Sequence, residues 1–514
     1  MILIMAEKPS VAGEIAKVVG ATTRGKGYLS GNDYIVSWCV GHLIELAKPG
    51  AYGEGLEKWS LDTLPIIPEN YITEVSSATA DQYAVLKELM SRADVSELVE
   101  ATDAGREGEL IFRLVYNQAG CKKPFKRLWI SSMEEKSIKD GLAGMKPGSA
   151  YDNLYEAALC RQRADWLVGI NLTRLFSKMY NKTLTCGRVQ TPTINLIVNR
   201  QRSIENFVPQ TYFTLTANCG SFKAYSRADD QAKAQQIVEK CSGKEAHVSK
   251  AEKEEKREIP AALYDLTTLQ RDANRLLGYS AQQTLDYLQK LYDNKLATYP
   301  RTDSRYITAD QEQSTRSLID TILATGIIST EVASNYSTEN VTMAQIINDK
   351  KVSDHHAVLP TSGVTKEKLD NLPTGERNIL LLVSYRLLSA VYAPHTYTAT
   401  KVVLDIEGEP FTATGREEID LGFKQIDDQV KKAVKAQEEK EDAPDTPENA
   451  VLPHMSEGNT FTASEVKAEP KKTKPQPSYT EDTLLKAMET AGKSIVDEEL
   501  KDAMKDSGLG TPAT

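Results

Sequence analysis

Three residues with polar side chains stand at every second position: Tyr299, Arg301 and Asp303. Pro300 disfavours the helical conformation for the tyrosine before it, so an extended backbone should place the three side chains on one side. A phenol can act as a nucleophile, and an arginine can stabilise the charge that develops on a phosphate. A tyrosine packed under a loop beside a surface arginine is the alternative for this stretch taken alone.

Carboxylates follow two separate strand-like runs. Glu7 comes after the apolar run Ile2–Met5, and Asp103 and Glu107 come after Leu98–Thr102, each time just before a helical pattern. Open α/β sheets bind ligands at such strand ends. Because clustered carboxylates repel one another without a proton or cation, and oxygen ligands suit Mg²⁺, we predict a magnesium site here. Acids favoured by a helix dipole are the alternative, and this explains Glu107 well.

The two acidic loops, with Lys8 beside one acid and Arg106 beside another, resemble the toprim domain of topoisomerases, bacterial primases and some nucleases. The toprim pattern is a lone glutamate plus D-x-D-x-E. Gly105 stands where the second aspartate belongs. We therefore expect a single, weakly held Mg²⁺ at Glu7 and Asp103, with Glu107 in support.

Two further blocks carry charged residues inside helical patterns. The first is R-Q-R-A-D-W-L from Arg161, and the second is G-R-V-Q-T-P from Gly187. Gly187 permits close backbone approach, Arg188 can bind a phosphate in two places, and a helix N-terminus offers free amide donors. An ion-paired helix surface is the alternative for the first block. Both blocks resemble the DNA-lining domain of type IA DNA topoisomerases, nearest to the topoisomerase III branch.

That resemblance covers nearly the whole chain and implies roles for particular residues. It implies DNA contacts by His42, Arg161, Asp165, Arg188 and Gln190. Of the adjacent histidines His355 and His356, it selects His355 for the catalytic site. It implies single-stranded DNA as the partner, a helicase as a candidate second partner, and a monomer.

The predicted fold is multidomain α/β and α+β. It combines a Rossmann-like toprim domain with a toroidal type IA topoisomerase core of helical domains and a β-rich arch. The expected domains are 1–150 (toprim), 151–210 with 476–514 (DNA-lining helices), 211–280 with 396–475 (arch and hinge), and 281–395 (helices carrying Tyr299).

The bulk composition is that of an ordinary soluble protein with several domains. The chain has 514 residues, 40% hydrophobic and 26% charged, and no apolar run long enough for a membrane. The net charge of −10 argues against a uniformly basic coat but leaves room for a local basic groove. Six scattered cysteines suit a reducing cytoplasm. The basic run Lys122, Lys123, Lys126 and Arg127 is expected to be a solvated loop, with a contact to the DNA backbone as the alternative.

These residues together predict an ATP-independent topoisomerase. Tyr299 attacks one DNA strand and forms a 5′-phosphotyrosyl intermediate, Arg301 and Lys8 stabilise the phosphate, and Glu7 passes a proton to the departing oxygen. The covalent bond preserves the energy needed for resealing, so negative supercoils can be relaxed and DNA decatenated without ATP. The chain has no G-x-x-x-x-G-K-[ST] motif for a nucleotide.

Two alternatives remain open from the sequence. A toprim nuclease would hydrolyse DNA with metal and no covalent step, although Gly105 removes an acid from its site. A non-catalytic single-strand-binding remnant is the other, because the final G-L-G-T-P-A-T resembles the start of a further helical stretch and suggests a truncated chain.

Overall fold

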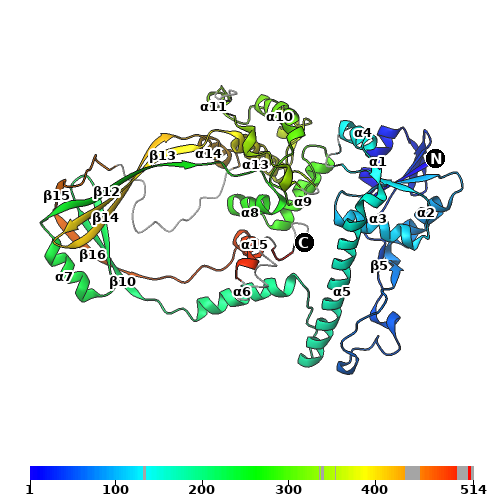
Figure 1. Cartoon of the computed structure of the whole chain (residues 1–514), viewed down its shortest axis with the longest axis horizontal. Coiled ribbons are helices and arrows are strands. Elements are labelled where there is room, and N and C mark those ends of the chain that lie inside the picture. The colour runs from blue at the N-terminus through cyan, green and yellow to red at the C-terminus, as the bar shows by residue number, and fades with distance from the viewer. Residues whose placement is uncertain are drawn as a thin grey trace.

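The computed structural model describes residues 1–130, 133, 135–334, 336, 341–352, 355–434, 452–494 and 508–510. Figure 1 shows their elements following one another around a ring. An N-terminal α/β unit (residues 2–147) lies on the right and a β-rich unit lies on the left. A helical unit that carries Tyr299 lies along the upper edge of the ring.

The N-terminal unit is built on one seven-stranded sheet. Its strands are β1 (Ile2–Ala6), β2 (Thr23–Gly25), β3 (Tyr28–Gly31), β4 (Tyr34–Trp38), β7 (Glu97–Ala101), β8 (Phe125–Arg127) and β9 (Lys146–Pro147). The order is β2-β3-β4-β1-β7-β8-β9, with β1 parallel to both of its neighbours. Strand β1 is apolar along its length because helices cover both faces of a parallel sheet. The helices are α1 (Pro9–Val19), α2 (Ala80–Ser91), α3 (Arg106–Gln118) and α4 (Glu135–Ala143), and β5 (Ile44–Leu46) pairs with β6 (Thr73–Val75).

The parallel pairing of β1 with β7 brings the two acidic loops together. Ala6 lies opposite Ala101, so Glu7 and Asp103 leave the sheet at the same edge. Helix α1 then begins at Pro9. Proline suits this position because the first N–H groups of a helix have no hydrogen-bond partner within the helix, so the N–H that proline lacks is not needed. Helix α3 begins after Gly105, whose φ of 151° is a backbone conformation that favours glycine.

Two long helices continue from the N-terminal unit. Helix α5 (Asp152–Tyr180) packs on α3 and ends at Asn181 in the left-handed conformation. Helix α6 (Gln190–Glu205) has no fully buried residue, and Ile194, Ile197 and Val198 on it are exposed. In Figure 1, α6 runs along the lower edge of the ring towards the β-rich unit.

The β-rich unit is a seven-stranded sheet of order β15-β12-β13-β14-β11-β10-β16, antiparallel throughout its pairings. Its strands are β10 (Thr211–Asn218), β11 (Lys223–Ala228), β12 (Lys244–Glu258), β13 (His395–Ile406), β14 (Glu409–Asp420), β15 (Thr460–Ala463) and β16 (Glu465–Lys472). Helix α7 (Gln231–Cys241) covers one face, where Leu215 and Phe411 are fully buried.

The helical unit contains the largest apolar core of the described residues. It comprises α8 (Leu266–Leu277), α9 (Ala281–Asp293), α10 (Glu312–Ala324), α11 (Thr330–Ser334), α12 (Lys366–Asn371), α13 (Thr374–Val391) and α14 (Lys424–Ala433). Helix α13 is buried on nearly every side, which makes it the centre around which the others pack. The loop carrying Tyr299 follows α9 and is fixed where Thr298 donates from its backbone N–H to Leu359 O at 2.9 Å.

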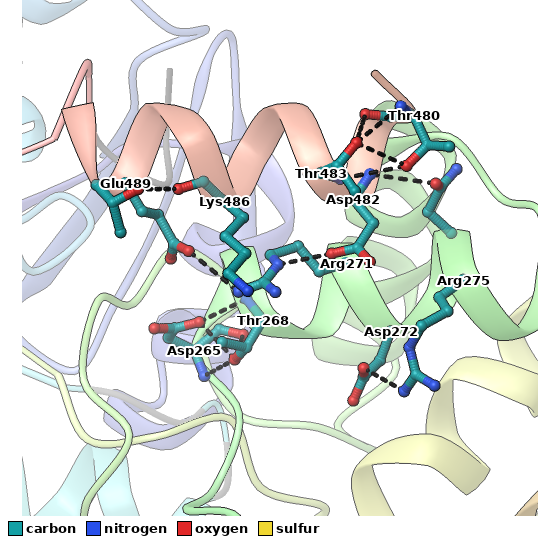
Figure 2. A network of polar contacts seen from close by, with 12 residues as sticks. Asp265, Thr268, Arg271, Asp272, Arg275, Thr480, Asp482, Thr483, Lys486 and Glu489 are labelled. Atoms are coloured by element: carbon teal, nitrogen blue, oxygen red, sulfur yellow. Dashed lines mark hydrogen bonds and ion pairs between the residues drawn. The ribbon is translucent and has the colours of Figure 1, made fainter. Parts of the chain in front are cut away.

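Helix α15 (Glu481–Glu489) connects α6 with the helical unit. Figure 2 shows Arg271 of α8 between two acids of α15, with Nε 2.7 Å from Asp482 Oδ1 and Nη1 3.3 Å from Glu489 Oε2. Thr480 caps the helix, where its side chain accepts from the backbone N–H of Thr483. Just before α15, Tyr479 lies under the Arg200 guanidinium of α6 at 4.0 Å.

Two further points concern the limits of the described chain. Of the final G-L-G-T-P-A-T motif, residues 511–514 lie outside the described residues. Within the described ranges, none of the helices has both the length and the apolarity that crossing a membrane requires.

Candidate active site

A cavity of about 460 Å³ lies where the N-terminal unit, α5 and the tyrosine loop meet. Nine of the predicted site residues line it: Glu7, His42, Asp103, Glu107, Arg161, Asp165, Tyr299, Arg301 and His355. The other three adjoin these residues: Lys8 pairs with Asp103, Arg188 pairs with Asp165, and Gln190 begins α6 just beyond Arg188. Sequence-distant residues are therefore gathered at one place.

Tyr299 lies at the centre of this site. Its phenol donates a hydrogen bond to Asp103 Oδ2 at 3.2 Å, across the contact between the helical and N-terminal units. The side chain is 8% exposed. Burial, and then the nearby carboxylates of Asp103 and Glu7, raise the pKa of Tyr299 well above its usual value. The phenol is thus neutral at rest and needs a proton acceptor and a neighbouring cation to react.

Glu7 is buried beside Asp103. Its Oε2 accepts from the backbone N–H of Asp103 at 3.1 Å. Burial, and then repulsion by the Asp103 carboxylate, raise the pKa of Glu7 from 4.5 to about 7, against the opposing effect of Lys8 and Arg301. A carboxyl group with a pKa near neutrality can both give and take a proton, which suits general acid–base work.

Two cations approach these acids. Lys8 Nζ lies 3.6 Å from Asp103 Oδ2, and Arg301 is an exposed side chain on the cavity wall. Both belong to the loops that carry Glu7 and Tyr299. A phosphate placed between Tyr299 and Glu7 would therefore meet positive charge from both units.

His355 packs against the tyrosine ring, with 4.3 Å between ring centroids. Its Nε2 donates to the carbonyl oxygen of Ala104 in the acidic loop. Burial lowers the pKa of His355 to about 4, so the ring is neutral at pH 7. In this conformation His355 holds the helical unit against the loop that carries Asp103.

The third predicted metal ligand, Glu107, is hydrogen-bonded to His42. Its Oε1 lies 2.5 Å from His42 Nε2. This hydrogen bond lowers the pKa of Glu107 and raises that of His42. Among the described residues, no three His, Cys, Asp or Glu side chains are grouped so as to hold a metal ion.

Glu7 and Asp103 nevertheless fit one divalent cation. They are adjacent, largely buried carboxylates, and their repulsion raises the pKa of Glu7, so a bound cation would relieve that repulsion. At Gly105, where the toprim pattern has its second aspartate, a Cβ would meet no atom within 4 Å. The space for a further acid is open, but the φ of 151° disfavours a side chain there.

The cations of α5 and the G-R-V-Q-T-P block form a second group beside the cavity. Arg188 Nε lies 2.7 Å from Asp165 Oδ1, and Arg161 Nε lies 4.0 Å from Asp165 Oδ2. Burial, followed by repulsion from Arg188 and Arg106, lowers the pKa of Arg161. Arg161 and Arg188 both pair with Asp165, and Arg106 lies near enough to repel Arg161, so this side of the cavity is attractive to a phosphate backbone.

The expectation of a solvated loop at 122–127 is wrong for Arg127. This residue ends β8 and is fully buried, with Glu100 and Glu109 beside it. It was missed because a basic run usually lies on the surface. A signal was present in the sequence, since Glu100 interrupts the apolar run of β7 and a buried acid needs a cationic partner.

A ring formed by a toprim-like sheet, helical units and a β-rich unit (Figure 1), with a tyrosine facing the acids of the sheet, defines a class: type IA DNA topoisomerases. Residues 2–133 match the family model of the Toprim domain, and residues 149–514 match that of DNA topoisomerase. The chain therefore belongs to this family, and the predicted family and fold class are confirmed.

Its relatives include several enzymes called DNA topoisomerase 3. One from Bacillus cereus is 39% identical over 526 residues, covering 100% of this chain and 70% of the relative. That of Bacillus subtilis (strain 168) is 38% identical, covering 100% and 71%. In fold, the chain resembles topoisomerase I from Thermotoga maritima, with a TM-score of 0.70 at 24% identity over 100% of this chain and 76% of that one.

Proposed function

We propose that this topoisomerase relaxes negative supercoils and decatenates DNA without ATP, through a 5′-phosphotyrosyl intermediate on Tyr299. The observation that carries the proposal is the hydrogen bond of 3.2 Å from the Tyr299 phenol to Asp103, which joins two units far apart in sequence. It supports a nucleophile that rests against an acidic loop and parts from it when the ring opens.

In the proposed reaction, the Tyr299 oxygen bonds to the phosphorus while the bond from phosphorus to the 3′ oxygen breaks. The phenol proton passes to Asp103, the acceptor already in contact, and Glu7 gives its proton to the departing 3′ oxygen. Arg301 and Lys8 stabilise the negative charge on the phosphate. Religation is the same exchange in reverse, so no nucleotide is consumed. His355 keeps the tyrosine loop against the acids.

Glu7 and Asp103 are the residues that would hold Mg²⁺, with Glu107 joining them if it leaves His42. Bound Mg²⁺ would neutralise the clustered carboxylates and organise the phosphate. The lack of an acid at Gly105 supports one weak site.

We further propose that His42, Arg161, Asp165, Arg188 and Gln190 contact single-stranded DNA along α5 and the start of α6. The surplus of cations around Asp165 supports this path. The domain division proposed from the sequence, a monomeric state, a helicase partner and a cytoplasmic location belong to the same proposal, the last supported by free, scattered cysteines.

A relaxation assay on negatively supercoiled plasmid, with denaturation to trap protein on DNA, tests the function. The wild-type protein should relax the plasmid and leave a covalent adduct, and Tyr299→Phe should do neither while folding normally. Nicking that persists in Tyr299→Phe would instead support a toprim nuclease. Binding of single strands without relaxation or adduct in the wild type would support a non-catalytic binding protein.

A further inference from the structure

The backbone of the loop that carries Asp103 is held by two side chains from outside the loop, Arg127 and His355. We call Thr102–Glu107 the acid loop. Arg127 donates from Nη1 to Thr102 O at 2.7 Å and from Nη2 to Asp103 O at 2.7 Å. The next carbonyl, Ala104 O, accepts from His355 of the helical unit. Three successive carbonyls are thus fixed, which determines where the Asp103 carboxylate points.

Arg127 is itself held rigidly. It is 0% exposed, and its Nε lies 3.5 Å from both Glu100 Oε1 and Glu109 Oε2. Its guanidinium also lies 5.1 Å from the centroid of the Trp129 ring. That ring stacks at 6.3 Å on His355, so the packing around Arg127 reaches the helical unit.

A second arginine, Arg113, pairs with Glu109, one of the buried glutamates beside Arg127, but does not touch the acid loop. Arg113 Nε donates to Glu109 Oε1 at 2.9 Å, and its Nη2 donates to Gly148 O and Asp152 Oδ1, both at 2.8 Å. Two arginines therefore lie against two fully buried glutamates, Glu100 and Glu109, and burial raises the pKa of Glu100 well above its usual value. Charge neutralisation alone would need only a cation at position 127. The fork onto two adjacent carbonyls needs an arginine, because an ammonium group cannot match its planar geometry.

We propose that Arg127 is a positioning residue, which fixes the acid loop so that Glu7 and Asp103 bind a divalent cation at the tyrosine. This role rests on the proposed function of that site. Residues that orient metal ligands through hydrogen bonds typically change metal affinity by about 10- to 100-fold when they are replaced. Loosening the loop should weaken cation binding without removing any ligand.

The test compares Arg127→Lys with Arg113→Lys, which alters the same buried cluster without touching the acid loop. Mn²⁺ binding is titrated by electron paramagnetic resonance, and the Mg²⁺ concentration for half-maximal relaxation is measured. Arg127→Lys should weaken Mn²⁺ binding by about tenfold and raise the Mg²⁺ requirement in step, with relaxation recovering at high Mg²⁺. Arg113→Lys should leave both values unchanged even where it lowers thermal stability.

The proposal is overturned if folded Arg127→Lys binds Mn²⁺ as wild type does, or if Arg113→Lys weakens binding equally. Should Arg127→Lys fail to fold, Arg127→Met with Glu100→Gln replaces the buried arginine together with the buried carboxyl group beside it, and removing both partners of a buried pair is often neutral for stability. The same tenfold weakening is expected, and unchanged binding overturns the proposal. If the wild type forms no Tyr299 adduct, the proposed function has failed, whereas an adduct with unshifted Mn²⁺ binding defeats the role of Arg127 alone.

Discussion

Replacing Glu7 with glutamine should stabilise the metal-free protein while abolishing its activity. Burial and Asp103 raise the pKa of Glu7 from 4.5 to about 7, so the folded state favours the protonated carboxyl. The stability that Glu7 contributes is then complete below pH 4.5 and is lost as the pH rises through 7. Each pKa unit is worth about 1.4 kcal/mol, so ionised Glu7 costs the folded protein about 3 kcal/mol at pH 8.

Glutamine keeps the shape of the side chain without the charge, so Glu7→Gln should raise the free energy of unfolding by up to about 3 kcal/mol at pH 8 and by almost nothing at pH 4. Urea unfolding with a chelator present, followed by tryptophan fluorescence, measures this difference at each pH. Relaxation of plasmid should be lost at both pH values, because the proposed proton donor is gone.

Glu14 provides a control of opposite sign in the same unit. Burial acts to raise its pKa, but hydrogen bonds from Lys17 and Lys295 outweigh this and lower it. Its contribution is therefore present at neutral pH and lost in acid, so Glu14→Gln should destabilise by about 1 kcal/mol or less at pH 8. The reasoning would be refuted if Glu7→Gln were less stable than wild type at pH 8. It would also be refuted if the variant gained as much unfolding free energy at pH 4 as at pH 8.

Three further predictions concern the surroundings of the site. Gly105→Asp should tighten Mn²⁺ binding in a titration, since its space is open, while the φ of 151° costs about 1–3 kcal/mol of thermal stability; unchanged binding would count against a second acid fitting there. Arg271→Ala should free α15 from α8 and speed proteolysis in 473–480 several-fold, whereas an unchanged cleavage rate would mean the ion pairs do not hold α15. Lys295 of the helical unit lies 2.5 Å from Glu14 of the N-terminal unit, so Lys295→Glu should weaken the contact between the two units and speed relaxation two- to fivefold at low salt. The double variant Lys295→Glu with Glu14→Lys restores the ion pair with its charges exchanged and should restore the rate.

The acidic loops were predictable because their placement follows from local patterns. Apolar runs followed by an acid and a helical spacing predict parallel strands, and parallel strands end at one edge. The extended turn at Pro300 likewise predicted that Tyr299 and Arg301 share a side, and both line the cavity. The family resemblance then ordered these pieces along the chain.

What the sequence did not reveal depends on contacts between distant segments. Nothing local pairs Glu107 with His42, because the two lie 65 residues apart and the pairing depends on where α3 meets the loop before β5. The burial of Arg127 is set by its strand position beside β7, which a run of lysines around it conceals. The charged run Lys250–Glu258 forms the C-terminal part of the long strand β12, and its pairing with β13 could not be read locally because β13 lies elsewhere in the sequence.

The strength of the contact that holds α15 on the helical unit should depend on the salt concentration of the solution. Arg271 of α8 lies between two carboxylates of α15, and Glu481 of α15 accepts from the backbone N–H of Ala281, at the start of α9, at 2.5 Å. Interactions between partly exposed charges fade within about 8 Å at physiological ionic strength. The salt concentration around the protein would thus tune how readily this contact parts, independently of any change in the chain itself.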